Sequence, residues 1–194
     1  MTGPRLLAAI AVAIAAMSVA IVTTVSPTEA AAHALVRWTA RTSLVLFSLA
    51  YVARPAVQLW PGPLTKRLLV ERKWIGLGFA TSHTAHLVGI LMIAAPDFGG
   101  FVRAQPPTNA IAALTFVALF AMAITSIEAV KRAMSARAWK FLHRTGIHLA
   151  WLSFAGTYLG AIAASPWYAI PAAIVVAIAA IRVAALVRSA RRRK

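Results

Sequence analysis

Cysteine is absent from this chain of 194 residues, and acidic residues are nearly so. Without a thiol there is no disulfide, no thiolate metal site and no cysteine nucleophile. Aspartate and glutamate together number four, against 20 lysines and arginines, and the formal net charge is +16. In a soluble protein this balance would suggest nucleic acid binding. The position of the charges along the chain therefore decides what they mean.

Charge of either sign is also scarce overall. Charged residues make up 12% of the sequence and hydrophobic residues 61%, with a mean hydropathy of +0.78. A typical soluble domain is about a quarter charged. This chain has too few polar groups to cover a surface that faces water. The composition predicts an integral membrane protein in contact with the lipid bilayer.

Six apolar runs account for nearly the whole chain. A transmembrane helix needs roughly 20 mostly apolar residues, and each run is long enough. We therefore expect an all-α, polytopic bundle of six transmembrane helices in a single domain over residues 1–194. The expected helices cover about 6–25, 34–53, 74–95, 109–127, 141–163 and 169–188, and a basic cytoplasmic tail follows at 189–194.

The basic residues are distributed unevenly between the two sides of the expected bundle. Only Arg37, Arg41 and Arg103 fall on one side. The positive-inside rule places the other side, with both termini, in the cytoplasm, and no nucleic acid partner is needed to explain the charge. The basic residues on that side are Arg54, Lys66, Arg67, Arg72, Lys73, Lys131, Arg132, Arg137, Lys140, Arg144, Arg188, Arg191, Arg192, Arg193 and Lys194.

The first apolar run has two interpretations. Arg5 precedes it, and Pro27 and a stretch of small residues follow, as in a secretory signal with its cleavage site. The run is longer than the usual core of a signal, which favours a retained helix. The tail after Arg188 has two interpretations as well, an anchor for anionic lipid or a docking site for an acidic electron-donor protein.

Histidines supply the polar chemistry of the expected membrane interior, because no carboxylate or lysine lies near a helix centre. His83 and His86 fall on the third helix, and His143 and His148 on the fifth. Counted from the starts of their apolar runs, His83 and His148 differ in level by about 3 Å. Such a pair could hold one heme iron from opposite sides. The fifth histidine, His33, falls at a helix end and is expected at the membrane interface.

These histidines are open to two roles other than heme ligation. A zinc protease needs His-Glu-x-x-His with the glutamate as base, whereas His83 and His86 enclose Thr84 and Ala85. That role is excluded. A structural role, in which neutral histidines hydrogen-bond to neighbouring helices, stays open beside heme ligation. Arg37 and Arg41 are also open to two roles, either snorkelling to the interface or pairing with heme propionates.

Two motifs resemble the ferric reductase-like transmembrane domain family over about residues 38–165. Arg72-Lys73-Trp74-Ile75-Gly76-Leu77, followed by His86, is similar to the family's opening of its third helix and a heme ligand. Trp139-Lys-Phe-Leu-His143-Arg144 is similar to the opening of its fifth helix. The family includes membrane ferric reductases, NADPH oxidases and the heme-binding membrane subunit of the bacterial methionine sulfoxide reductase system.

The resemblance implies a b-type heme held by histidines and electron transfer across a membrane, here the bacterial inner membrane. Family members often carry a second histidine on each helix and bind two hemes. Counting 13 residues on from His143 leads to Gly156, so one heme is expected rather than two. The resemblance favours His86 and His143 as ligands, whereas the matched levels favour His83 with His148, and the pairing stays open.

The expected function is that of an electron-transfer component of an oxidoreductase. The sequence has no FAD or NADPH motif, so a separate flavoprotein or a quinone is expected to donate the electrons. The electron acceptor is not identified. The alternative is a non-enzymatic assembly or interaction subunit that has the fold and binds no heme, which the missing second histidines motivate.

Overall fold

A computed structural model describes residues 3–107 and 109–192. The described part of the chain is helical and contains no strand, which confirms the all-α class. The helices are α1 (Pro4–Thr24), α2 (Thr28–Leu59), α3 (Pro63–Ala94), α4 (Phe98–Ala104), α5 (Asn109–Ile124), α6 (Glu128–Arg132), α7 (Ala136–Ala161) and α8 (Ala169–Arg191), with short 3-10 turns η1 (Ala95–Asp97) and η2 (Pro166–Tyr168).

Four of the described segments are long and apolar enough to cross a membrane, and they are based on α1, α2, α3 and α8. The expected count of six is therefore not confirmed. α5 has 16 residues, which at about 24 Å is shorter than a hydrocarbon core of about 30 Å. α7 is long enough, with 26 residues, but Arg137, Lys140 and Arg144 make its first turns polar.

Several helices extend beyond the apolar runs that mark them in the sequence. α2 and α3 have 32 residues each, and only residues 60–62 separate them. Pro63 starts α3 with its fixed backbone angle, and the Thr65 hydroxyl accepts a hydrogen bond from the Gly62 amide at 3.1 Å. The basic residues expected in this connection therefore lie on helices. Similarly, α8 continues to Arg191 into the expected tail, whereas Arg193 and Lys194 lie outside the described residues.

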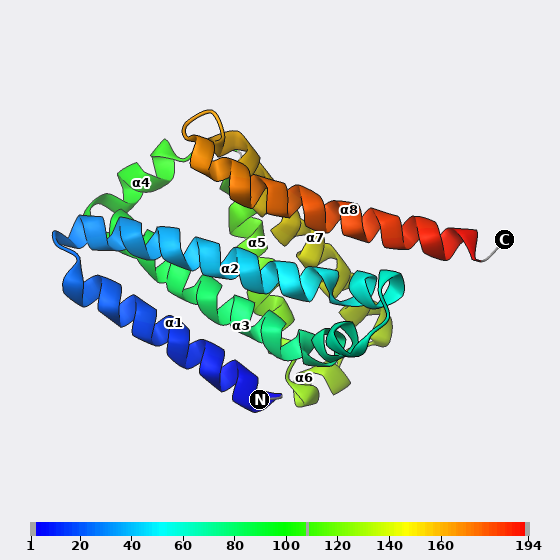
Figure 1. The fold of residues 1–194 in the computed structure, drawn as a ribbon. Coiled ribbons are helices and arrows are strands. Elements are labelled where there is room, and N and C mark those ends of the chain that lie inside the picture. The colour runs from blue at the N-terminus through cyan, green and yellow to red at the C-terminus, as the bar shows by residue number, and fades with distance from the viewer. Residues whose placement is uncertain (1–2, 108, 193–194) are drawn as a thin grey trace.

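The α2–α3 hairpin forms the centre of the bundle (Figure 1). α1 packs on α3 and α2, α8 packs on α2 and α7, and α5 packs mainly on α7. The start of α1, the α2–α3 turn, α6 and the end of α8 lie toward one end, while the α1–α2 and α7–α8 connections lie toward the other. This arrangement places the basic stretches at one end of the bundle.

Aromatic side chains from three helices fill the space between α2, α3 and α7. The Phe47 ring is central, with centroids 5.5 Å from Phe79 and 5.2 Å from both Phe154 and Tyr51. All four side chains are buried. Aromatic ring pairs at such distances contribute about 0.5–1.5 kcal/mol beyond their burial, so this cluster joins α7 to the hairpin.

Glycine allows the close approach of α2 and α3. A Cβ added to Gly89 would lie 2.8 Å from Val36 Cγ2 and 3.2 Å from the Val36 amide nitrogen. Gly156 and Gly160, whose spacing is typical of helix packing, have no atom within 4 Å of such a Cβ. The close contact of α2 with α3 therefore depends on Gly89, whereas the Gly156–Gly160 pair makes no such contact.

We expect Gly89→Leu to destabilise the protein by about 1–3 kcal/mol, the usual cost of overpacking, because the Val36 backbone cannot move aside. Gly156→Leu is the matched control and should leave the melting temperature of the detergent-solubilised protein nearly unchanged. Equal losses in the two variants would contradict the described packing.

Candidate histidine site

The two histidines of α3 lie side by side on the face that meets α2 and α5. Their ring centroids are 5.1 Å apart and their planes differ by 18°. His83 is buried, with 8% of its surface exposed, and His86 is half-buried. The Phe116 ring of α5 lies 4.7 Å from the His83 ring. The expected pair on the third helix is therefore a compact feature of the bundle interior.

A chain of hydroxyl groups on α2 and α3 fixes the proton of His83. Ser82 donates to the Thr39 carbonyl oxygen at 3.1 Å, and Ser43 donates to Ser82 Oγ at 2.9 Å. Each hydroxyl has one proton to donate, so Ser43 Oγ must accept from His83 Nδ1, which lies 3.2 Å away. We call Ser43 and Ser82 the hydroxyl chain. It assigns the proton of His83 to Nδ1.

His86 has the same tautomer for a simpler reason. Its Nδ1 lies 3.0 Å from the Val36 carbonyl oxygen, which can only accept a hydrogen bond, and 3.2 Å from Thr39 Oγ1. Nδ1 therefore carries the proton, and Nε2 keeps its lone pair. A neutral imidazole held in this way by a backbone carbonyl is the usual form of a metal-ligating histidine. Both α3 histidines offer Nε2 as a ligand atom.

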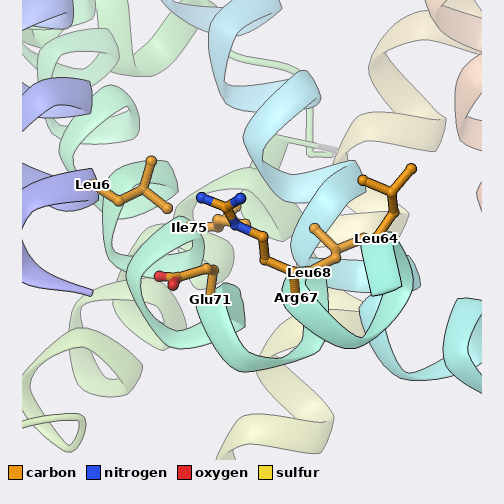
Figure 2. Close-up of a pocket in the computed structure, with 6 residues that line it drawn as sticks. All are labelled: Leu6, Leu64, Arg67, Leu68, Glu71 and Ile75. Carbon is orange, nitrogen blue, oxygen red and sulfur yellow. The ribbon is translucent and has the colours of Figure 1, made fainter. Parts of the chain in front are cut away.

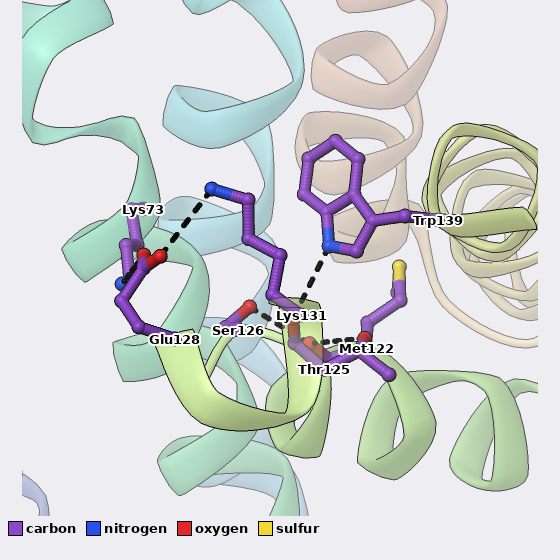
Figure 3. Close-up of polar contacts among 7 residues, drawn as sticks. All are labelled: Lys73, Met122, Thr125, Ser126, Glu128, Lys131 and Trp139. Carbon is purple, nitrogen blue, oxygen red and sulfur yellow. Dashed lines mark hydrogen bonds and ion pairs between the residues drawn. The ribbon is translucent and has the colours of Figure 1, made fainter. Parts of the chain in front are cut away.

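The first histidine of α7 is bonded in the opposite sense. His143 Nε2 lies 3.1 Å from Thr125 Oγ1, whose own proton goes to the Ala121 carbonyl oxygen at 2.7 Å. Nε2 of His143 is therefore the donor. The Trp139 ring stacks on His143 at 4.1 Å, and its Nε1 donates to the Thr125 carbonyl oxygen (Figure 3). His143 is held as a structural link between α5 and α7.

His148 is exposed on α7, with the Tyr51 ring edge-on at 6.1 Å. It does not lie at the level of His83, contrary to the expectation from the apolar runs. On α2, the partners of His83 and His148 are Ser43 and Tyr51, eight residues apart, which corresponds to about 12 Å. On α7, His83 meets Phe154 at 6.0 Å, six residues from His148 and thus about 9 Å away.

His83 and His148 lie at different levels because an apolar run and the helix that contains it begin at different residues. α3 starts at Pro63, well before its run, whereas α7 starts at Ala136, only one turn before its own. Among the described residues no group of three or more histidine, aspartate or glutamate side chains could hold a metal ion. An axial heme site needs only one or two imidazoles, and α3 supplies those with the right tautomer.

Arg37 and Arg41 are exposed and lie away from the histidine pair. Thr39, between them in sequence, faces α3, and residues two apart on a helix point to nearly opposite sides. The Arg41 guanidinium lies 5.0 Å from the centroid of the Trp38 ring on the same helix. This contact favours the interfacial role of Arg41.

Sequence reasoning missed two features of this region. The first is the hydroxyl chain with the Thr39 carbonyl oxygen on which it ends. Its only trace in the sequence is that Thr39 and Ser43 are four residues apart, on one face of a largely apolar helix. Arg182 lies within the last apolar run, where a charged side chain is itself a functional signal. Its guanidinium lies 4.6 Å from the centroid of the Tyr51 ring, close to His148.

The described residues form a bundle of apolar helices, four of them long enough to span a membrane. The family model for the ferric reductase like transmembrane component matches residues 37–155. The match covers more than half of the chain, so the chain belongs to this family. Comparisons with curated proteins and with solved structures returned no match.

Cysteine pairs can test the register of the site, because the chain has no cysteine of its own. We expect the double variant Ser43→Cys, Ser82→Cys to form a disulfide on mild oxidation, since the two oxygens are 2.9 Å apart. Ser48→Cys with Ser82→Cys is the control and should stay reduced, because Ser48 lies on another face of α2. Mass spectrometry after thiol alkylation distinguishes the two results, and the reverse pattern would rule out the described register.

Proposed function

We propose that this protein is a membrane-embedded b-type heme protein that relays electrons across the membrane. The observation that carries the proposal is the α3 histidine pair, in which both Nδ1 atoms donate to α2 or its hydroxyls and both Nε2 atoms stay unprotonated. When bound, a heme supplies an iron that takes up and gives up one electron at a time. Family membership supports a membrane redox component.

Of the two α3 histidines, His86 would hold the heme iron. Its Nδ1 proton is fixed by the Val36 backbone, so no side-chain rotation can reverse its tautomer. A hydrogen bond at Nδ1 also raises the basicity of Nε2 as a ligand. His83 is more deeply buried and faces Phe116, and we assign it a supporting role that keeps the His86 ring aligned by stacking.

We propose one heme, held from α3, rather than a pair of hemes between α3 and α7. Phe154, and not a histidine, meets His83 from α7. His143 Nε2 could bind iron only after its hydrogen bond with Thr125 is broken. His148 lies nearer the start of α7 than Phe154 does. A heme held by both helices would therefore require α7 to shift along its axis.

Electrons are proposed to come from a separate flavoprotein or a quinone, and the acceptor is unassigned. We place both termini in the cytoplasm of a bacterial cell, at the inner membrane, because the basic ends of the helices gather at one end of the bundle. We also infer that α1 is retained. The Gly3 amide donates to Glu71 Oε2 at 2.8 Å, and Ile10 fills the space beside Gly78.

The first prediction here concerns heme content. Protein purified in detergent from heme-replete cells should contain close to one heme per chain by the pyridine hemochrome assay. His86→Ala should remove most of it, whereas His148→Ala and the control His33→Ala should retain it, because their rings lie away from the α3 pair. A colourless wild-type protein would instead favour the assembly subunit without heme. Loss of heme in His148→Ala would instead favour a heme held by histidines of both α3 and α7.

The second prediction concerns topology. A reporter fused to the C-terminus should behave as cytoplasmic, and one inserted beside Arg103 as external, because the basic stretches stay inside. N-terminal sequencing of the purified protein should find the first residues of the chain. A mature protein that starts near Ala31 would show that the first apolar run is a cleaved signal, while the α3 histidines would keep their places.

A further inference from the structure

Each of the four acidic side chains has a partner other than Arg72 and Arg182. The chain has four acidic residues, so their partners can be followed one by one. Glu71 accepts from the Gly3 amide beside Leu6 of α1 (Figure 2), and Glu128 pairs with Lys73 at 3.2 Å and Lys131 at 3.6 Å (Figure 3). The other two are Glu29, which lies 4.0 Å from His33, and Asp97, which accepts from the Gly100 amide.

The exposed carboxylate of Glu128 lies between two lysines. The hydrogen bond from Lys73, with the charges of Lys131 and Lys73, lowers the pKa of Glu128 below its ordinary value. Glu128 therefore stays charged and committed to two lysines at neutral pH. Among the described residues, no acidic side chain forms an ion pair with Arg72 of α3 or Arg182 of α8.

Those arginines converge on residues 50 and 51 of α2. Arg182 of α8 stacks on the Tyr51 ring at 4.6 Å, and His148 of α7 meets the same ring at 6.1 Å. Arg72 of α3 donates its Nε to the Ala50 carbonyl oxygen at 3.0 Å. We call Arg72, Arg182 and His148 the cation cluster. Three helices thus bring basic side chains to one point of α2.

The two guanidinium groups are half-buried and lie beside neighbouring residues of α2. Partly buried like charges are costly unless an opposite charge accompanies them. Arg72 uses Nε for the backbone and keeps its other two nitrogens as donors. Guanidinium groups bind phosphate oxygens in pairs of parallel hydrogen bonds. The arrangement therefore suits an anion with several oxygens.

The cluster combines the exposed His148 with two half-buried guanidinium groups, and it lies apart from both the basic tail and the histidine pair. Arg188 donates to the carbonyl oxygen of Leu59, the last residue of α2, at 2.7 Å. Arg182 is six residues earlier on α8, about 9 Å further in. On α2 the cluster is about 12 Å from Ser43, the level of His83. A ligand here is therefore separate from the proposed heme.

We propose that the cation cluster binds a phosphate group between α2, α7 and α8. The phosphate belongs either to the headgroup of an anionic lipid or to a free phosphate ion, since both present non-bridging phosphate oxygens. Arg72 and Arg182 supply the charge and the hydrogen bonds, Tyr51 holds Arg182 in place, and the His148 ring offers one further N–H donor.

The test compares stabilisation of the delipidated, detergent-solubilised full chain by three additions. These are phosphatidylglycerol, phosphatidylcholine and inorganic phosphate, each titrated while the melting temperature is recorded. We expect phosphatidylglycerol or inorganic phosphate to raise the melting temperature of the wild type. Saturation by phosphatidylglycerol alone identifies a lipid headgroup, and equal action of inorganic phosphate identifies a free anion. Equal stabilisation by phosphatidylcholine and phosphatidylglycerol, with none by phosphate, would overturn the proposal.

Substitutions test whether this stabilisation arises at the cation cluster. Arg182→Gln and Arg72→Gln should each shift the titration midpoint to about five-fold higher concentration, the loss expected for one basic residue near a membrane surface. Arg103→Gln on exposed α4 removes the same charge elsewhere and should keep the wild-type midpoint. His148→Gln serves if an arginine variant does not fold. Midpoints unchanged in all cluster variants would also overturn the proposal, and heme content, read from the same samples, reports on the proposed heme separately.

Discussion

The hydrogen bond from His86 Nδ1 to the Val36 carbonyl oxygen is the constraint on which the centre of this bundle depends. That oxygen belongs to the backbone of α2 and cannot be moved without unwinding the helix. The same turn of α2 supplies Thr39, whose carbonyl oxygen ends the hydroxyl chain. Because unpaired polar groups are costly inside a membrane, the bond fixes how far α3 can slide along α2. Gly89, three residues after His86 on α3, lets the backbones of α2 and α3 come close enough to form this hydrogen bond.

The scarcity of carboxylates has structural consequences beyond topology. With four acidic residues available, the protein uses one to join α1 to α3 and one to join α3 to α6. Its other polar contacts between helices come from hydroxyls, imidazoles, indole and guanidinium N–H groups, and backbone carbonyls. Such contacts are local and geometrically strict, so they set register well, but they cannot neutralise an arginine. Within the described part of the chain, no acidic side chain pairs with Arg72 of α3 or Arg182 of α8.

The features that could be read from the sequence are those that depend on residue type alone. The helical class, the membrane environment and the α3 histidines follow from composition and from where polar residues interrupt apolar runs. Relative levels could not be read, because they depend on where each helix begins, and Pro63 starts α3 well ahead of its apolar run. The tautomers of His83, His86 and His143 depend on partners from α2 and α5, which no spacing within one helix predicts. Arg182 was missed because its neighbours are apolar and its partner Tyr51 lies far away in sequence.

The length of the α2–α3 hairpin has a consequence for the shape of the protein at the membrane surface. Two helices of 32 residues each are about 48 Å long, against a hydrocarbon core of about 30 Å. Tilting absorbs part of such an excess, and the remainder of a helix longer than the hydrocarbon core lies among the headgroups. Lys66 and Arg67, near the α2–α3 turn, are basic residues of the kind that anionic headgroups attract.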